Sequence, residues 1–183
     1  SLAIVEERSV GPSLGSDSVQ GGKMAAIVAL IAVMLLMFAS YGLFGLFADI
    51  ALMFNLAFIF ALLSGLQATL TLPGIAGIIL TMGIAVDANV LIYERIREEL
   101  RHGRSVMSAI DTGFDQARRT IWDSNLTTLI VAFILFSFGS GPVKGFAVAM
   151  SIGIVTSLYS SLMLTRLIII FWLKRTKPSA LTL

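Results

Sequence analysis

The stretch GIAVDANVLIYERIREELRHGR, from Gly83 to Arg104, decides the fold because it joins two halves of opposite character. Its first half continues an apolar run, and its second half is dense in charge. This pattern is typical of a helix that crosses a membrane and then projects from it. Asp87 lies in the apolar half, where a carboxylate is costly and must face a partner or a water-filled cavity. The stretch therefore predicts a membrane helix with a functional acid inside it.

The composition extends this interpretation to the whole chain. Of its 183 residues, 57% are hydrophobic and 13% are charged, whereas about a quarter of the residues of a soluble domain are charged. The chain has no cysteine and one histidine, which excludes disulfides, a thiolate nucleophile and metal sites built from several such residues. It also has no Walker-type phosphate loop, so we expect no ATP hydrolysis by that route and an ion gradient as the energy source. We expect no cofactor, with protons as the coupling ion. The expected fold class is an all-α, polytopic transmembrane helical bundle.

Five apolar runs approach the roughly 20 residues that are needed to cross a hydrocarbon core. We predict spans at about residues 24–47, 51–70, 74–93, 123–138 and 146–173, within a transmembrane domain of residues 23–177. The turn-rich residues 1–22 are expected to form an extracytoplasmic linker, residues 94–122 a loop and residues 178–183 a tail.

Positive charge predicts the orientation of these spans. Six arginines lie in the loop at residues 94–122 and further basic residues follow the fifth span, so this side is expected to be cytoplasmic. The linker then lies outside, although it is polar and has no signal-peptide pattern. We therefore expect an upstream span and an exported domain to be missing from this chain. Spontaneous translocation of a short tail is the alternative.

The loop at residues 94–122 is predicted to be largely helical. Its charged first part continues the third span to a stop at Gly103, and Ser105 can cap a second helix. The second helix carries an apolar stripe at helical spacing, formed by Val106, Ala109, Ile110, Phe114, Ala117 and Ile121. This stripe fits either a cytoplasmic amphipathic helix on the membrane surface or packing against the ends of neighbouring helices.

Asp87 is the first candidate for chemistry. A rise of about 1.5 Å per residue places it roughly 20 Å from the outer end of the third span, within the hydrocarbon. Burial disfavours a charged carboxylate and a nearby arginine favours it, so a group between these limits can load and release a proton. Gly74, Gly77 and Gly83 allow other backbones to approach this helix. Asn89 points elsewhere on the helical wheel, where it can bridge to a neighbouring helix.

The start of the fourth span supplies a second polar group in the sequence WDSNLTT, residues 122–128. Asp123 can cap this helix, or it can join Asn125, Thr127 and Thr128 in a polar cluster that faces Asp87. Threonine side chains can hydrogen-bond back to their own helix at low cost. The sequence leaves open whether the two helices touch.

Arg166 is the third candidate, because it lies within the fifth span about two turns before the basic tail. It can snorkel to the cytoplasmic interface, or it can supply the counter-charge to Asp87 or Asp123. Asp49, near the first cytoplasmic turn, is expected to be interfacial. The candidates for a proton relay are thus Asp87, Asn89, Asp123, Asn125, Thr127, Thr128 and Arg166.

Three stretches resemble the SecD branch of the SecD/SecF family of protein-export membrane proteins, which is similar to the resistance–nodulation–division superfamily of proton-driven transporters. They are VGPSLGSDS at residues 10–18, TLPGIAGIILTMGIAVDANVLIYERIREELRHGRS at residues 71–105 and WDSNLTTLIVAFILFSFGSGPVKGFA at residues 122–147. The family has six spans, with a large periplasmic domain between the first two. The resemblance therefore implies that this chain is the C-terminal membrane part, spans two to six, in the bacterial inner membrane.

The resemblance also implies a function and partners. Family members work with a SecF-like paralogue beside the SecYEG channel and use the proton-motive force to drive late stages of the export of unfolded preproteins. Asp87 matches the family's intramembrane aspartate in AVDAN, and Asp123 and Asn125 fall in its D-x-N-x-T motif. Arg166 matches a recurring arginine of the last span.

Two other classes of function compete with a proton-conducting transport subunit. In an intramembrane protease, Asp87 and Asp123 would form a dyad that shares a proton, but Asp123 lies near a span end and the glycine-flanked G-x-G-D pattern is absent. We therefore expect no enzymatic activity. In a non-conducting structural scaffold of the translocon, Asp87 would be a structural hydrogen-bonding group. The expected partners are proteins and the lipid bilayer, and no nucleic acid.

Overall fold

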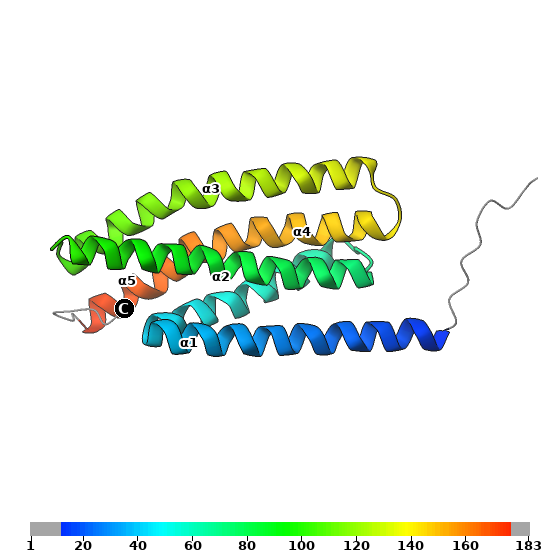
Figure 1. The fold of residues 1–183 in the computed structure, drawn as a ribbon, viewed down its shortest axis with the longest axis horizontal. Coiled ribbons are helices and arrows are strands. Elements are labelled where there is room, and N and C mark those ends of the chain that lie inside the picture. Colours follow the sequence, from blue (N-terminus) through cyan, green and yellow to red (C-terminus); the bar gives the residue numbers. More distant parts are fainter. Residues whose placement is uncertain (1–11, 177–183) are drawn as a thin grey trace, which may run out of the picture.

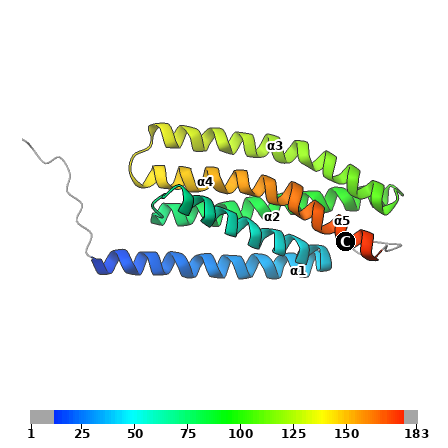
Figure 2. The same ribbon diagram turned by 180° about the vertical axis from the view of Figure 1, so that it is seen from behind.

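The computed structural model describes residues 12–176, and every regular element in this range is helical. The elements are α1 (Pro12–Gly65), α2 (Leu72–Arg101), α3 (Val106–Phe138), α4 (Pro142–Tyr159), a π-helical segment (Ser160–Leu164) and α5 (Thr165–Thr176). They lie lengthwise in one elongated bundle (Figures 1 and 2). Four segments are long and apolar enough to cross a membrane, namely Asp17–Gly65, Leu72–Arg101, Val106–Phe138 and Pro142–Thr176. The first two predicted spans therefore belong to one element, α1.

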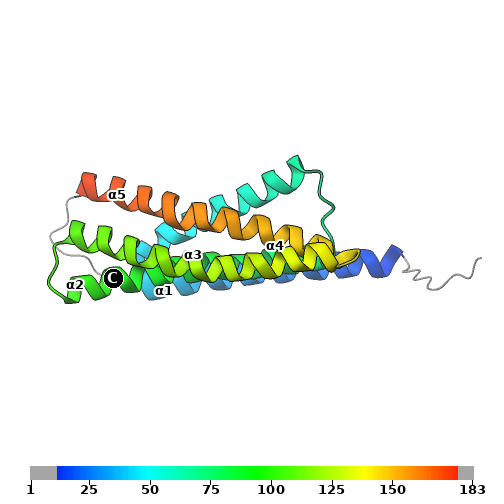
Figure 3. The same cartoon turned by 90° about the horizontal axis from the view of Figure 1, so that it is seen from above.

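Within α1, the chain reverses direction at Gly42. Its backbone there has φ 53° and ψ −120°, a conformation that side chains with a Cβ rarely adopt. A Cβ at Gly45 would overlap the carbonyl oxygen of Met37, so a second glycine permits the close return. Residues 12–41, the first arm, and residues 43–65, the return arm, thus run in opposite directions (Figures 1 and 3). The prediction of a break at residues 47–51 is wrong, because the conformation that the turn needs is available at Gly42.

The start of α1 also differs from the prediction. Residues 12–22, expected to be a linker, form the first turns of the helix, while residues 1–11 and the predicted tail lie outside the described residues. Proline is favoured at the first helical position, where Pro12 stands, because its missing N–H has no helical partner there. Adding a residue to an existing helix costs less free energy than forming the first turn, so the helix that begins in the apolar segment can extend upstream through the turn-rich stretch.

Helix α2 matches its prediction, including the charged extension. The Thr71 hydroxyl accepts a hydrogen bond from the Gly74 N–H at 3.2 Å and caps the helix start. The helix then runs without a break through the apolar half and the charged half to Arg101. Gly103 follows with φ 79°, the left-handed conformation in which glycine commonly ends a helix.

Helix α3 is continuous from Val106 to Phe138, so the predicted separate surface helix and the helix start near Asp123 are wrong. Ser105 does precede the helix, but its side chain makes no capping hydrogen bond. The apolar stripe is buried against the core rather than laid on a membrane surface, as in the alternative interpretation; Ala109, Ile110, Phe114, Ala117 and Ile121 are each at most 3% exposed. Asn125 and Ala132 prolong the same buried face, which explains why the predicted surface helix and the predicted fourth span form one continuous helix.

Small residues bring α2 and α4 into close contact. The nearest backbone atom to a Cβ built on Gly77 is the carbonyl oxygen of Phe146, at 3.2 Å, and a Cβ on Gly153 would overlap the Thr81 side chain. Close packing through small residues is a common way for membrane helices to associate. Gly83 has no such neighbour, so only part of the predicted glycine contacts is formed. The predicted fifth span runs on through the π-helical segment, after which α5 diverges from α3 (Figure 3).

Candidate functional site

Asp87 borders a pocket of about 150 Å³ between α2 and α3. From α2 the pocket is lined by Ile84, Asp87 and Leu91, which share one flank at helical spacing. The Asp87 side chain is exposed and makes no hydrogen bond or ion pair with any other residue in the described part of the chain. The carboxylate is therefore free to bind a proton, water or a group from outside this chain.

Helix α3 supplies the other wall of the Asp87 pocket with Thr120, Ser124 and Asn125. Asn125 is 3% exposed, and its Nδ2 donates to the carbonyl of Ile121 at 2.8 Å. Its Oδ1 is buried and has no partner among the described residues. A buried acceptor without a partner is costly, and it can accept a hydrogen bond from a water or from a protonated carboxyl. The helices that carry Asp87 and the predicted polar cluster thus do touch.

Asn89 lies on a different face of α2 and has a different role. It is 1% exposed, and its Oδ1 accepts a hydrogen bond from the Thr165 hydroxyl at 3.0 Å. Thr165 is the first residue of α5, so this bond joins α2 to the last helix. The predicted bridge to a neighbouring helix is confirmed. Asn89 does not line the Asp87 pocket.

Asp123 is exposed in the middle of α3, so it does not cap a helix. The predicted back-bonding is confirmed, because the Thr127 hydroxyl donates to the Asp123 carbonyl at 3.1 Å and the Thr128 hydroxyl to the Ser124 carbonyl at 3.2 Å. Asp123 does not line the pocket that Asp87 borders. Asp87 and Asp123 are therefore not brought together at this site.

Arg166 pairs with neither of the predicted aspartates. Its Nη2 lies 2.9 Å from Asp111 Oδ1, and its guanidinium lies 5.7 Å from the centre of the Phe114 ring. Both partners belong to α3, so Arg166 joins α5 to the first turns of α3. Asp111 was not singled out by the sequence, although its spacing of three residues from Phe114 places it beside the apolar stripe.

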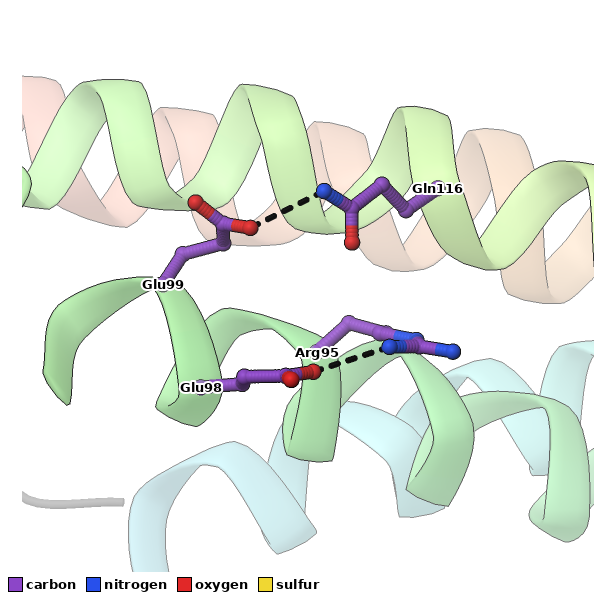
Figure 4. A network of polar contacts seen from close by, with 4 residues as sticks. All are labelled: Arg95, Glu98, Glu99 and Gln116. Atoms are coloured by element: carbon purple, nitrogen blue, oxygen red, sulfur yellow. Dashed lines mark hydrogen bonds and ion pairs between the residues drawn. The ribbon is translucent and has the colours of Figure 1, made fainter. Parts of the chain in front are cut away.

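The turn between α2 and α3 is fastened by polar contacts. Glu99, which is buried, accepts a hydrogen bond from Gln116 at 2.9 Å (Figure 4). It also pairs with Arg104 at 2.5 Å. Arg95 and Glu98 form an exposed pair at 2.8 Å on α2. The contacts of Glu99 hold the charged end of α2 against the turn and α3, whereas the pair between Arg95 and Glu98 lies within α2.

Residues 1–175 match the family described as protein export membrane protein SecD/SecF, C-terminal. The chain belongs to the SecD/SecF family. It is similar to the protein translocase subunit SecD of Rickettsia bellii, with 61% identity over 182 residues, which is 100% of this chain and 35% of that protein. The SecD subunit of Acetobacter pasteurianus is 51% identical over 180 residues, which is 98% of this chain and 34% of that protein.

A solved structure supports the same assignment. The crystal structure of SecDF, a translocon-associated membrane protein from Thermus thermophilus, matches with a TM-score of 0.91 and 45% identity. The match covers 96% of this chain and 25% of that one. The chain thus spans about a third of the length of its SecD relatives and has the helical arrangement of the quarter of the SecDF chain that it matches.

Two buried polar residues of this SecD/SecF membrane domain were missed by the sequence. Asp49 is 4% exposed and its Oδ1 has no partner among the described residues, so it is buried by the protein, which the sequence did not indicate. Asn55 is fully buried, and neither atom of its amide has a partner within residues 12–176. The early reversal at Gly42 draws Asp49 into the bundle. The rule that singled out Asp87, a polar group in an apolar run, also applies to these two residues.

Proposed function

We propose that this chain is the membrane part of a bacterial protein translocase subunit that uses the proton-motive force to drive late stages of protein export. Asp87 is the group that binds and releases the proton. The observation that carries this proposal is a carboxylate without a protein partner, in a pocket on a helix apolar enough to cross a membrane. Ionisable groups inside membranes are rare and mark ion pathways more often than structural contacts.

In this proposal the chain crosses the membrane five times, because the two arms of α1 each make one crossing. The reversal at Gly42, the α2–α3 turn and α5 lie at the same end of the bundle (Figure 1). That end carries most of the basic residues, Arg95, Arg97, Arg101, Arg104, Arg118, Arg119, Lys174 and Arg175. The positive-inside rule then makes it the cytoplasmic end, in a bacterial inner membrane, and places the start of α1 outside.

The Asp87 pocket offers a simple coupling step. Ionised Asp87 needs water or another polar partner, which keeps the space between α2 and α3 open and hydrated. A proton from the outside neutralises Asp87, and the neutral carboxyl can donate a hydrogen bond to Asn125 Oδ1, which otherwise has no partner. The space then closes, and release of the proton to the cytoplasm reopens it. Movement of α2 against α3 is the output of each cycle.

The partners proposed for this subunit are a SecF-like paralogue and the SecYEG channel, with unfolded preproteins as the cargo. Relatives that bear the name protein translocase subunit support this assignment. The exposed position of Asp87 in the isolated chain is consistent with a neighbouring subunit that completes the proton path. A purely structural role for Asp87 within this chain is disfavoured, because no helix of residues 12–176 offers its carboxylate a hydrogen-bonding partner.

The proposal is tested with inverted membrane vesicles that contain the protein as its genome encodes it. The measured quantity is the rate at which a secretory precursor becomes protease-protected, with and without an imposed proton gradient. We expect Asp87→Asn, which keeps size and polarity, to remove the acceleration by the gradient. Asp123→Asn is the matched control, because Asp123 is also exposed but lies outside the pocket, and it should retain the acceleration. A full acceleration in Asp87→Asn would refute the proposal.

A further inference from the structure

A second and larger groove, of about 1050 Å³, opens between α3 and the α4–α5 segment. Its α3 wall includes Trp122, whereas the Asp87 pocket includes Ser124. These two residues are two positions apart, about 200° around the helix, so the groove and the Asp87 pocket lie on different flanks of α3. Beyond the π-helical segment the backbone of α5 diverges from that of α3 (Figure 3), and residues of both helices line the groove. Nothing in the proposed proton cycle uses this groove.

The body of the groove is apolar and its side chains are open to the surroundings. Met163 is 61% exposed, and Leu167 and Phe171 are each 65% exposed. They lie on the segment that is long and apolar enough to cross a membrane. In the proposed membrane orientation the part of this segment that precedes Lys174 faces hydrocarbon, so an occupant of the groove must present an apolar surface to these residues.

The end of the groove nearest the α2–α3 turn is lined by three cations, Arg118, Arg166 and Lys174, and by no acidic residue. Arg166 is neutralised by Asp111 at 2.9 Å. Arg118 and Lys174 have no ion pair within the described range of residues 12–176. Trp122 stands beside them and is 51% exposed, as is common for an aromatic residue at the level of lipid headgroups. The groove therefore needs an occupant with an anionic head and a long apolar body.

We propose that this groove binds one anionic phospholipid, with its acyl chains along α4–α5 and its headgroup phosphate on Arg118 and Lys174. Basic pockets between membrane helices at the cytoplasmic side have the chemistry for such headgroups. A zwitterionic lipid also offers a phosphate, but its own ammonium group cancels that charge, so the headgroup supplies no net negative charge to the two cations. A helix of a partner protein would need a carboxylate at this level to do the same. The bound lipid fills the space between α3 and α5 and supplements the Arg166–Asp111 contact.

The test uses bromine-labelled lipids, which quench tryptophan fluorescence on contact. The purified protein is prepared with Trp122 as its only tryptophan, which requires Trp172→Phe within this chain. It is reconstituted with brominated phosphatidylglycerol in unlabelled phosphatidylcholine, and then with the labels exchanged. We expect phosphatidylglycerol to be preferred at Trp122 by roughly tenfold or more, because each basic residue near the surface favours anionic lipid.

Charge variants decide where the preference arises. Arg118→Gln combined with Lys174→Gln should abolish the preference for phosphatidylglycerol. Arg119→Gln combined with Arg175→Gln is the matched control, because these neighbours lie outside the groove, and it should keep the preference. Equal quenching by both lipids in the parent protein would overturn the proposal. An equal loss of the preference in both double variants would also overturn it, because it indicates general attraction to the surface. So would an absence of quenching of Trp122 by either lipid, which indicates that a protein fills the groove.

Discussion

Asp87 and Asn89 are two polar residues of one short motif, AVDAN, but they have opposite surroundings in the bundle. Asn89 is buried and hydrogen-bonded to Thr165 at 3.0 Å, so it fastens α2 to α5. Asp87 is exposed, borders the pocket between α2 and α3 and has no partner in the part of the chain that the structure describes. One helix thus carries a fixed polar face and a free polar face about 200° apart. A polar residue in a membrane helix can therefore either stabilise the fold or remain available for chemistry.

The largest effect is expected where the fixed face of α2 meets α4. Gly153→Ala places a Cβ against the Thr81 side chain, so we expect a loss of about 1–3 kcal/mol in the free energy of unfolding. Gly83→Ala is the matched control, because a Cβ there has no neighbour within 4 Å, and it should raise stability slightly. Thermal unfolding of the purified protein checks both. Equal stability of the two variants would show that this face is not tightly packed.

The next prediction separates the two polar faces by function. Thr165→Val removes the hydrogen bond to Asn89 and should cost about 1 kcal/mol of stability, as is typical of bonds between membrane helices. Gradient-driven export should be unchanged when it is measured below the unfolding temperature. Thr128→Val is the control, because its hydroxyl bonds only to its own helix, and it should cost less. Loss of export in Thr165→Val at full stability would place Asn89 and Thr165 in the proton path.

The free face of α2 is tested through its neighbour on α3, by the change Asn125→Leu. This change removes the unpartnered Oδ1 that borders the Asp87 pocket, together with a hydrogen bond to its own helix. We expect gradient-driven export to slow about fivefold, the equivalent of one hydrogen bond of about 1 kcal/mol, with little change in melting temperature. The opposite pattern, a marked fall in melting temperature with normal export per folded molecule, would show that Asn125 stabilises the fold and takes no part in proton transfer.

The smallest effect is expected at the ion pair between Arg166 and Asp111. Both side chains are partly exposed, at 39% and 52%, and such pairs contribute about 0.2–1 kcal/mol. Arg166→Gln should therefore lower the melting temperature slightly and should not affect gradient-driven export. A double-mutant cycle with Asp111→Asn measures the pair directly. A strong loss of export in Arg166→Gln alone would support the predicted link between Arg166 and the proton path.

Much of this arrangement follows from local sequence rules. Pro73 lies in the first turn of α2 and Gly103 follows its end, and the spacing of the apolar stripe correctly indicated a helix from Val106. The pairing of Arg166 with Asp111 and the position of the reversal were not predictable in the same way. Many residues between two apolar runs can host a turn, and only the backbone geometry at Gly42 and the close approach of Met37 to Gly45 distinguish the position that the chain uses.

The candidate site was partly predictable for a similar reason. An acidic residue within an apolar run is visible in the sequence, so Asp87 could be found. Helical spacing then placed Asn89 on another face of the same helix. Which helices surround each residue depends on packing between distant segments. That information decided that Asn125 borders the Asp87 pocket, that Asp123 lies outside it, and that Asp49 is buried.

The most direct test of the account is proton flux through vesicles that contain the full protein together with its SecF-like paralogue. Flux is followed with a pH-sensitive dye inside the vesicles after a proton gradient is imposed, for the parent protein and for Asp87→Asn. We expect gradient-dependent flux in the parent protein and none above background in Asp87→Asn, with both proteins folded to the same extent. Undiminished flux in Asp87→Asn would contradict the central claim that the free carboxylate of AVDAN carries the proton.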